Sequence, residues 1–177
     1  GDVYKRQASD TPILDQITFY GEARMVDTVP KGLPPGSDVA NLALMGYDAT
    51  KNYTGRAAIE AAGADINMKD NDVALRCNLV TVINEEMHDY SAGHISTNEA
   101  KELISSLQKE LGNENFTFHC GVQYRHLLIW NNGSVDYSCT PPHEISDKKI
   151  HSYIPSGYDS TMLIDLMEKS CLLYTSD

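Results

Sequence analysis

The stretch from residue 32 to residue 41, GLPPGSDVAN, restricts the backbone more than any other part of this sequence. Its two prolines limit φ and cannot continue a helix, and the glycine after them permits a sharp reversal. The apolar residues that follow recur at helical spacing, which predicts a helix over residues 38–45. Ser37 is therefore expected at or near the N-cap of that helix.

A serine at this position has two interpretations. Its hydroxyl can simply cap the helix, which is a common role of serine at a helix start. Alternatively, the unpaired backbone N–H groups and the positive end of the helix dipole suit an anion such as a phosphate ester. Asn41 lies one helical turn after Ser37, so its amide either contacts the same group or faces solvent. This stretch alone does not decide between the two.

Composition and charge exclude several classes of protein. The chain has 177 residues, of which 41% are hydrophobic and 22% are charged, as is typical of a soluble globular protein. A formal net charge of −11 disfavours nucleic acid and anionic membranes as partners, although it permits a local basic pocket for a phosphorylated metabolite. No apolar run approaches the length of a membrane span, and no signal-peptide pattern is present. We therefore expect a cytoplasmic protein.

The cysteines and histidines show no metal-binding pattern. Cys77, Cys120, Cys139 and Cys171 include no CxxC pair and are expected to be reduced and mostly buried. The histidines form neither an HExxH motif nor any compact metal spacing, so a self-contained zinc site is not expected.

The first third of the chain predicts an α/β order of elements. A short helix should follow the Thr11-Pro12 pair and end at Gly21. A strand fits residues 23–29, and a helix of small residues fits residues 57–62. The Ser37 helix lies between them, which gives the succession of strand, turn and helix found in α/β proteins.

From about residue 65 the pattern changes to that of an α+β unit. DVALRCNLVTV predicts a buried strand, and FTFHC and YRHLLIW predict two more. STNEAKELISSLQKELG predicts an amphipathic helix with a Ser96/Glu99 capping box and Gly112 as its stop. NNGS is a hairpin signal that should pair YRHLLIW with SVDYSC. YDSTMLIDLMEKS predicts a last helix, with Met162, Leu163, Leu166 and Met167 on one face.

Five blocks in this order resemble one family. They are TVPKGLPPGSDVANLALMGYDATKNYTGR, DVALRCNLVT, DYSAGHISTNEA, YRHLLIW and TPPHEI. Together, over residues 11–170, they resemble the archaeal-type cofactor-independent phosphoglycerate mutases, a branch of the alkaline phosphatase superfamily. The resemblance implies an α/β fold: part of an alkaline-phosphatase-like α/β domain with an inserted α+β domain. It places residues 8–64 in the first domain, 65–155 in the inserted domain and 156–170 at the return to the first.

The resemblance also implies an activity, which is the interconversion of 3-phosphoglycerate and 2-phosphoglycerate in glycolysis. The serine of the PGSDVAN block is the family's nucleophile, so Ser37 is expected to carry the phosphoryl group and to contact the metals. Two divalent metal ions, manganese, magnesium or zinc, would lower the pKa of its hydroxyl and neutralise the phosphoryl oxygens.

The chain departs from the family pattern at both ends. The Asp-Gly metal-binding turn that opens family members and the C-terminal half that carries most metal ligands have no counterpart here. GDVYKRQ at residues 1–7 and CLLYTSD at residues 171–177 resemble translated sequencing-adapter read-through rather than ordinary frayed termini. We therefore expect an internal fragment of a longer enzyme, inactive by itself.

Three arginines and two histidines are candidate substrate ligands. Arg76 and Arg125 interrupt apolar runs, where a charged side chain needs a partner or a cleft, and Arg56 ends the YTGR block. Guanidinium groups bind phosphate and carboxylate in bidentate fashion, although structural salt bridges would explain the same arginines. His94 and His126 either orient the substrate, exchange protons with it, or are structural histidines.

Two other functions stay open at this point. A bacterial subgroup with similar blocks has been proposed to be a homoserine kinase, and the same serine and metals would serve that reaction. The chain alone could also be a module that binds a small phosphorylated acid without converting it.

Overall fold

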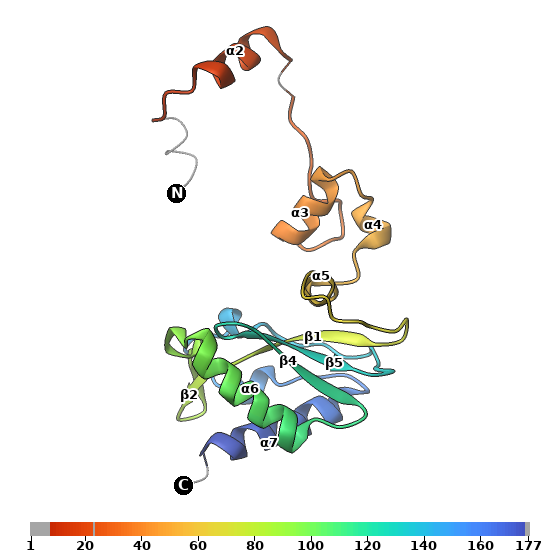
Figure 1. Ribbon diagram of the computed structural model, residues 1–177, viewed down its shortest axis with the longest axis vertical. Coiled ribbons are helices and arrows are strands. Elements are labelled where there is room, and N and C mark those ends of the chain that lie inside the picture. Colours follow the sequence, from red (N-terminus) through yellow and green to blue (C-terminus); the bar gives the residue numbers. More distant parts are fainter. Residues whose placement is uncertain (1–7, 23, 176–177) are drawn as a thin grey trace. The chain divides into compact units, whose positions relative to one another are not determined.

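The computed structural model describes residues 8–22 and 24–175 of the chain (Figure 1). The chain divides between Tyr53 and Thr54 into two units, which we call unit 1 and unit 2. The expected N-terminal tail, residues 1–7, lies outside the described residues, whereas residues 171–175 of the expected C-terminal tail are described and belong to a helix that starts at Ser160. None of the helices described is both long and apolar enough to cross a membrane.

The described part of unit 1 contains three helices, α2 (Pro12–Tyr20), α3 (Ser37–Leu44) and α4 (Ala49–Asn52). The predicted first helix is confirmed, with Gly21 at its C-cap, where the Gly21 N–H donates to the Ile17 carbonyl at 2.8 Å. Asp48 caps α4 by accepting a hydrogen bond from the Thr50 N–H.

The prediction of a strand over residues 23–29 is wrong for the residues that the structure describes. Residue 23 lies outside the described part, and residues 24–29 have no strand structure. A strand needs a neighbour for its backbone N–H and C=O groups, and no described residue pairs with this segment. Its apolar side chains lack a core as well, since Met25 is fully exposed.

Unit 2 is built on an antiparallel sheet with β5 (Arg125–Trp130) at its centre. Its edges are β1 (Val73–Asn78) and β4 (Phe116–Val122), while β2 (Thr81–Ile83) and β3 (Glu86–Asp89) form a separate pair. The helices are α5 (Arg56–Gly63), α6 (Thr97–Leu111) and α7 (Ser160–Thr175), with short 3-10 helices η1 (Ala92–His94), η2 (Pro142–Glu144) and η3 (Ile150–Tyr153).

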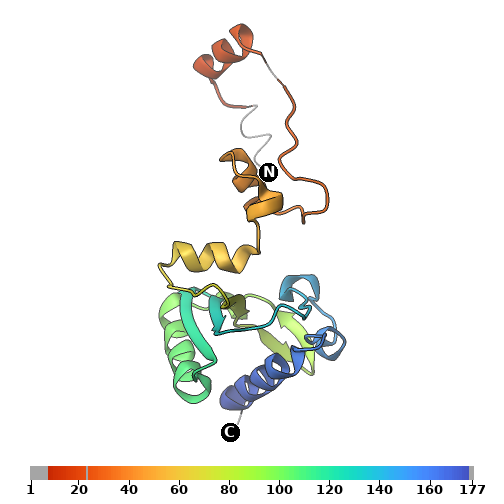
Figure 2. The same ribbon diagram turned by 90° about the vertical axis from the view of Figure 1, so that its right-hand side faces the viewer.

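The sheet is covered by helices on both faces (Figures 1 and 2). On one face α6 and α7 pack over the larger core cluster: Ile104, Leu107, Phe116, Phe118, Leu128, Trp130, Leu163 and Leu166. On the other face Ala61 of α5 packs against Leu127 and Ile129. The alternation along β5 explains this division, since successive strand residues point to opposite faces.

The capping box predicted for α6 is confirmed. The Ser96 hydroxyl accepts from the Glu99 N–H at 3.3 Å, and the Glu99 carboxylate accepts from the Ser96 N–H at 3.1 Å. These reciprocal bonds satisfy two backbone donors that a helix start otherwise leaves free.

The prediction of a hairpin at NNGS is wrong. β5 already pairs with β1 on one side and with β4 on the other, so neither of its edges is available to SVDYSC. Asn132 does adopt a positive φ of 48°, as a turn residue, and the chain then leaves the sheet. The hairpin at β5 forms earlier, where Val122 pairs with Arg125 across a two-residue turn.

Two further expectations are corrected. DVALRCNLVTV forms two strands, because β1 ends at Asn78 and β2 starts at Thr81; β1 is half-buried, whereas β2 is mostly exposed. Cys120, Cys139 and Cys171 are exposed, and only Cys77 is partly buried. The helix expected from YDSTMLIDLMEKS is confirmed as α7, on which Leu163 and Leu166 are buried and Met162 and Met167 are exposed.

Candidate functional site

Ser37 is the first residue of α3, one position later than an N-cap, and Gly36 is the N-cap. Its side chain is exposed, and no described residue forms a hydrogen bond with its hydroxyl. The Ala40 N–H donates to the Gly36 carbonyl, so the N–H groups of the first turn have no partner within the helix. Ser37 therefore stands where backbone donors and the helix dipole favour an anion.

Tyr53 fixes the residue next to Ser37. The Tyr53 hydroxyl donates to Asp38 Oδ2 at 2.6 Å. A β-carbon on Gly36 would lie 2.2 Å from Asp38 Oδ1, so a larger residue at position 36 would displace this carboxylate. Asn41, expected to share the face of Ser37, is exposed on the next turn of α3.

Arg76 and Arg125 lie on the same face of the unit 2 sheet. Arg76 pairs with Leu127, and Arg125 pairs with Asn78. Residues directly opposite each other in an antiparallel pair share a face, which makes the two arginines diagonal neighbours. This is the face that α5 partly covers, since Leu127 packs against Ala61.

Arg56 joins Arg76 through a residue that the sequence did not single out. Glu60 accepts from Arg56 Nε at 2.9 Å and from Arg76 Nε at 3.1 Å. Three side chains from α5 and β1 thus form one charged cluster, which we call the Arg56–Glu60–Arg76 cluster.

Arg125 is held by its neighbour in the sequence. Its Nη2 donates to the Tyr124 hydroxyl at 2.8 Å, and its guanidinium carbon lies 4.7 Å from the Tyr124 ring centroid. The Tyr90 ring packs edge-on against the Tyr124 ring, with 6.1 Å between the two ring centroids. The loop after β3 therefore supports the turn that carries Arg125.

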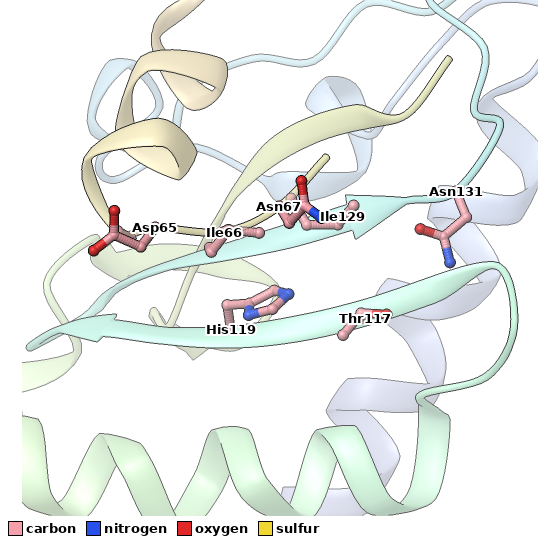
Figure 3. Close-up of a pocket in the computed structure, with 8 residues that line it drawn as sticks. Asp65, Ile66, Asn67, Thr117, His119, Ile129 and Asn131 are labelled. Atoms are coloured by element: carbon pink, nitrogen blue, oxygen red, sulfur yellow. The ribbon is translucent and has the colours of Figure 1, made fainter. Parts of the chain in front are cut away.

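The same face of the sheet is hollowed farther along β5. The hollow has a volume of about 430 Å³ and lies between β4, the end of β5 and the segment after α5 (Figure 3). Its polar side chains are Asp65, Asn67, Thr117, His119 and Asn131. Partial burial lowers the pKa of His119, which favours a neutral imidazole there.

His94 is exposed in η1, at the end of a strained turn. Ala92 and His94 have positive φ angles of 50° and 57°, which residues other than glycine rarely adopt. The Asp89 carboxylate holds this turn by accepting from the Ser91 hydroxyl and from the Ser91 and Gly93 N–H groups. These bonds, led by that of the Ser91 hydroxyl, lower the pKa of Asp89 to about 2.

His126 lies on the opposite face of the sheet from Arg125. It is 2% exposed, and its Nδ1 accepts from the Gly121 N–H at 3.1 Å. Burial lowers its pKa to about 4, so the ring is neutral at physiological pH. This placement is that of a structural histidine, and it separates His126 from the arginines.

The structure thus groups some of the predicted residues and not others. Arg56, Arg76 and Arg125 share one face of unit 2, while Ser37 and Asn41 belong to unit 1. Glu60 was missed, although its spacing carried a signal. It lies four residues after Arg56 on a helix.

The described residues bring no three His, Cys, Asp or Glu side chains together as a metal site. Ser37 and Asp38 therefore do not by themselves fit a two-metal centre.

Comparisons with known proteins agree with one another. A family model described as 2,3-bisphosphoglycerate-independent phosphoglycerate mutase matches residues 20–175. A protein of that name from Methanosarcina barkeri is 48% identical over 168 residues, which cover 94% of this chain and 42% of the relative. A probable enzyme of the same name from Geobacter sulfurreducens is 45% identical over 171 residues, which cover 94% of this chain and 43% of the relative. These names give no support to the homoserine kinase alternative.

One solved structure shows the fold. The cofactor-independent phosphoglycerate mutase from Thermoplasma acidophilum matches with a TM-score of 0.60 and 22% identity, over 81% of this chain and 41% of that one. The mixed helix and sheet fold is therefore as predicted. The chain spans about two-fifths of the length of the curated relatives it matches.

Proposed function

Since this chain belongs to the family of 2,3-bisphosphoglycerate-independent phosphoglycerate mutases, we propose that it is part of an enzyme that interconverts 3-phosphoglycerate and 2-phosphoglycerate. The observation that carries the proposal is the position of Ser37. It lies within the matched residues, exposed, at the first position of a helix whose start favours anions.

Ser37 supplies the nucleophile in this proposal. Its Oγ forms a bond to the phosphorus as the bond from phosphorus to the glycerate oxygen breaks, and its proton ends on that oxygen. The phosphoserine then transfers its phosphoryl group to the other hydroxyl of the glycerate, which restores the serine. The N–H groups at the start of α3 donate to the phosphoryl oxygens in both steps.

Unit 2 supplies the substrate contacts. Arg76 and Arg125 lie on one face of its sheet, and Arg56 on α5 joins Arg76 through Glu60. Guanidinium groups match both the carboxylate and the phosphate of a phosphoglycerate. His94 stands on the loop that supports the Arg125 turn and is the remaining candidate for orienting the substrate. Asn41 is the candidate contact from unit 1.

The divalent metals that the family resemblance implies would neutralise phosphoryl charge and make the serine a stronger nucleophile. The described side chains do not form a site for them, so no step of the proposal is assigned to metal ligands of this chain.

The test is a mutase assay that follows 2-phosphoglycerate through coupled enolase. We expect the full-length enzyme with manganese to be active and the Ser37→Ala enzyme to lose at least about a thousandfold in kcat. Asp165→Asn, which removes one exposed ion pair on α7, is the matched control and should keep wild-type activity.

The chain alone is the second arm of the assay. We expect no mutase activity from it, because an unassisted serine hydroxyl is a weak nucleophile at neutral pH. Turnover by the chain at the full-length rate would contradict this expectation, and a fully active Ser37→Ala enzyme would contradict the mechanism.

A further inference from the structure

One carboxylate in unit 2 serves two arginines. Glu60 Oε1 accepts from Arg56 Nε at 2.9 Å, and Glu60 Oε2 accepts from Arg76 Nε at 3.1 Å. About a third of the Glu60 side chain is exposed, and Arg76 is similarly covered at 29%. Both oxygens of the carboxylate are therefore engaged at a partly covered position.

Both guanidinium groups use the same nitrogen, Nε, which lies at the base of the group. In the part of the chain that the structure describes, no terminal Nη nitrogen of Arg56 or Arg76 donates to a protein acceptor. Each arginine therefore keeps its terminal donors for an external anion. A guanidinium group binds carboxylate or phosphate in bidentate fashion through pairs of such donors.

The helical turn that carries Glu60 is anchored on the sheet. The next residue, Ala61, is fully buried against Leu127 and Ile129, so the turn of α5 that carries Glu60 is fixed on the sheet. An ordinary exposed ion pair joins two mobile side chains and contributes little. Here one carboxylate on an anchored turn of α5 accepts from two cations that would otherwise repel each other, the half-exposed Arg56 and the more covered Arg76.

We propose that Glu60 is a positioning residue that holds Arg56 and Arg76 together so that their terminal nitrogens form one binding site for the phosphate or carboxylate of the substrate. The proposal rests on the proposed mutase function and extends it to a residue that does not touch the substrate. Its charge leaves the cluster with a net charge of +1, which still attracts an anion.

The kinetic test uses the full-length enzyme with Glu60→Gln, which keeps the shape of the side chain and removes its charge. We expect KM for 3-phosphoglycerate to rise roughly tenfold, the equivalent of losing about 1.4 kcal/mol of binding, while kcat changes less than about twofold. Glu60→Ala should raise KM further. Asp165→Asn again serves as the control, since it also removes the carboxylate of an i,i+4 ion pair.

A second readout does not depend on turnover. Only five arginines occur in the chain, so the side-chain Nε–H signals of Arg56 and Arg76 can be assigned by NMR. In Glu60→Gln we expect both signals to move, and the Kd of the chain for 3-phosphoglycerate to rise by about the same factor as KM.

The outcomes separate the two proposals. An inactive wild-type full-length enzyme would overturn the mutase function, and the NMR titration would still decide the role of Glu60. An unchanged or lower KM and Kd in Glu60→Gln would overturn the positioning role, since a lower value means that Glu60 competes with the substrate. Absence of 3-phosphoglycerate binding by the wild-type chain would overturn it as well.

Discussion

Unit 2 buries two clusters of apolar side chains between its own elements, whereas the described part of unit 1 has no such cluster. Both core clusters consist of unit 2 residues, while only Val39 and Ala49 are buried hydrophobic residues among the described part of unit 1. The exposed large apolar residues of unit 1 are Ile13, Leu14, Ile17, Phe19, Tyr20, Met25, Val26, Leu44, Met45 and Tyr47.

The difference follows from which elements each unit contains. In unit 2 the α6 and α7 helices close one face of a sheet whose strands pair with one another. In unit 1 the described elements include helices but no strand, so the apolar residues of α2 have nothing to pack on. The domain boundaries predicted from the sequence stay a prediction.

The largest effect on stability should come from the unit 2 core. Ile104 is 2% exposed and lies in the larger cluster, so Ile104→Ala removes apolar contacts and leaves a cavity. We expect the free energy of unfolding of the chain to fall by roughly 3–4 kcal/mol, measured by urea denaturation. A loss below about 1 kcal/mol would show that the unit 2 core is not closed as described.

The next effect depends on pH and concerns the buried histidine of unit 2. Burial lowers the pKa of His126 to about 4 from the ordinary 6.5. Between these values the unfolded chain binds a proton that the folded chain does not, so stability falls as the pH is lowered from 6.5 toward 4. The loss attributable to His126 should reach about 2–3 kcal/mol near pH 4.5.

His126→Asn isolates this contribution. The asparagine oxygen can still accept from the Gly121 N–H, but the side chain no longer titrates. All other titratable groups are common to both proteins, so the difference between their unfolding free energies at pH 7 and pH 4.5 reports His126 alone. An equal pH dependence in the two proteins would show that the ring is accessible to protons in the folded state.

Local sequence signals predicted the helices of both units well, because a capping box or a Thr-Pro start acts within a few residues. The strand pairings were not predictable in the same way. NNGS is a good turn sequence, yet β5 already has β1 and β4 as neighbours, and those neighbours are set by segments up to 57 positions away in the chain. The exposure of the cysteines was not predictable either, since Cys120 lies at the irregular end of β4, Cys139 lies outside any strand and Cys171 lies on α7.

A smaller effect is expected at the start of α6. Ser96→Ala removes the hydroxyl that accepts from the Glu99 N–H, and we expect a loss of about 1 kcal/mol in the free energy of unfolding. Ser96→Asp retains an acceptor at the N-cap and should restore most of it. Equal stabilities of the two variants would contradict the capping role.

The smallest effect tests the comparison from the other side. Ile17 on α2 is 65% exposed, so Ile17→Ala deletes the same atoms as Ile104→Ala where no core surrounds them. We expect the free energy of unfolding to fall by less than about 0.5 kcal/mol, measured by the same urea denaturation. A loss comparable to that of Ile104→Ala would mean that unit 1 has a core of its own.

The candidate site was predictable residue by residue but not as an arrangement. Ser37 was placed within one position of its true place by its turn sequence alone. Arg76 and Arg125 were selected because charges interrupt apolar runs, and the register then puts them on one face. The pairing of Glu60 with Arg76 was not predictable from the sequence, because the two side chains meet only when α5 packs on β1. For His126 the structural interpretation is favoured, since strand alternation turns it away from Arg125 into a buried position.

The central claim is that Ser37 carries the phosphoryl group, and mass spectrometry of the peptide containing Ser37 tests it most directly. The full-length enzyme is quenched with acid during turnover of 3-phosphoglycerate and then digested. The account predicts a peptide heavier by one phosphoryl group with the modification on Ser37, and no such peptide from the Ser37→Ala enzyme. An active enzyme whose Ser37 stays unmodified while another residue carries the phosphoryl group would contradict the claim.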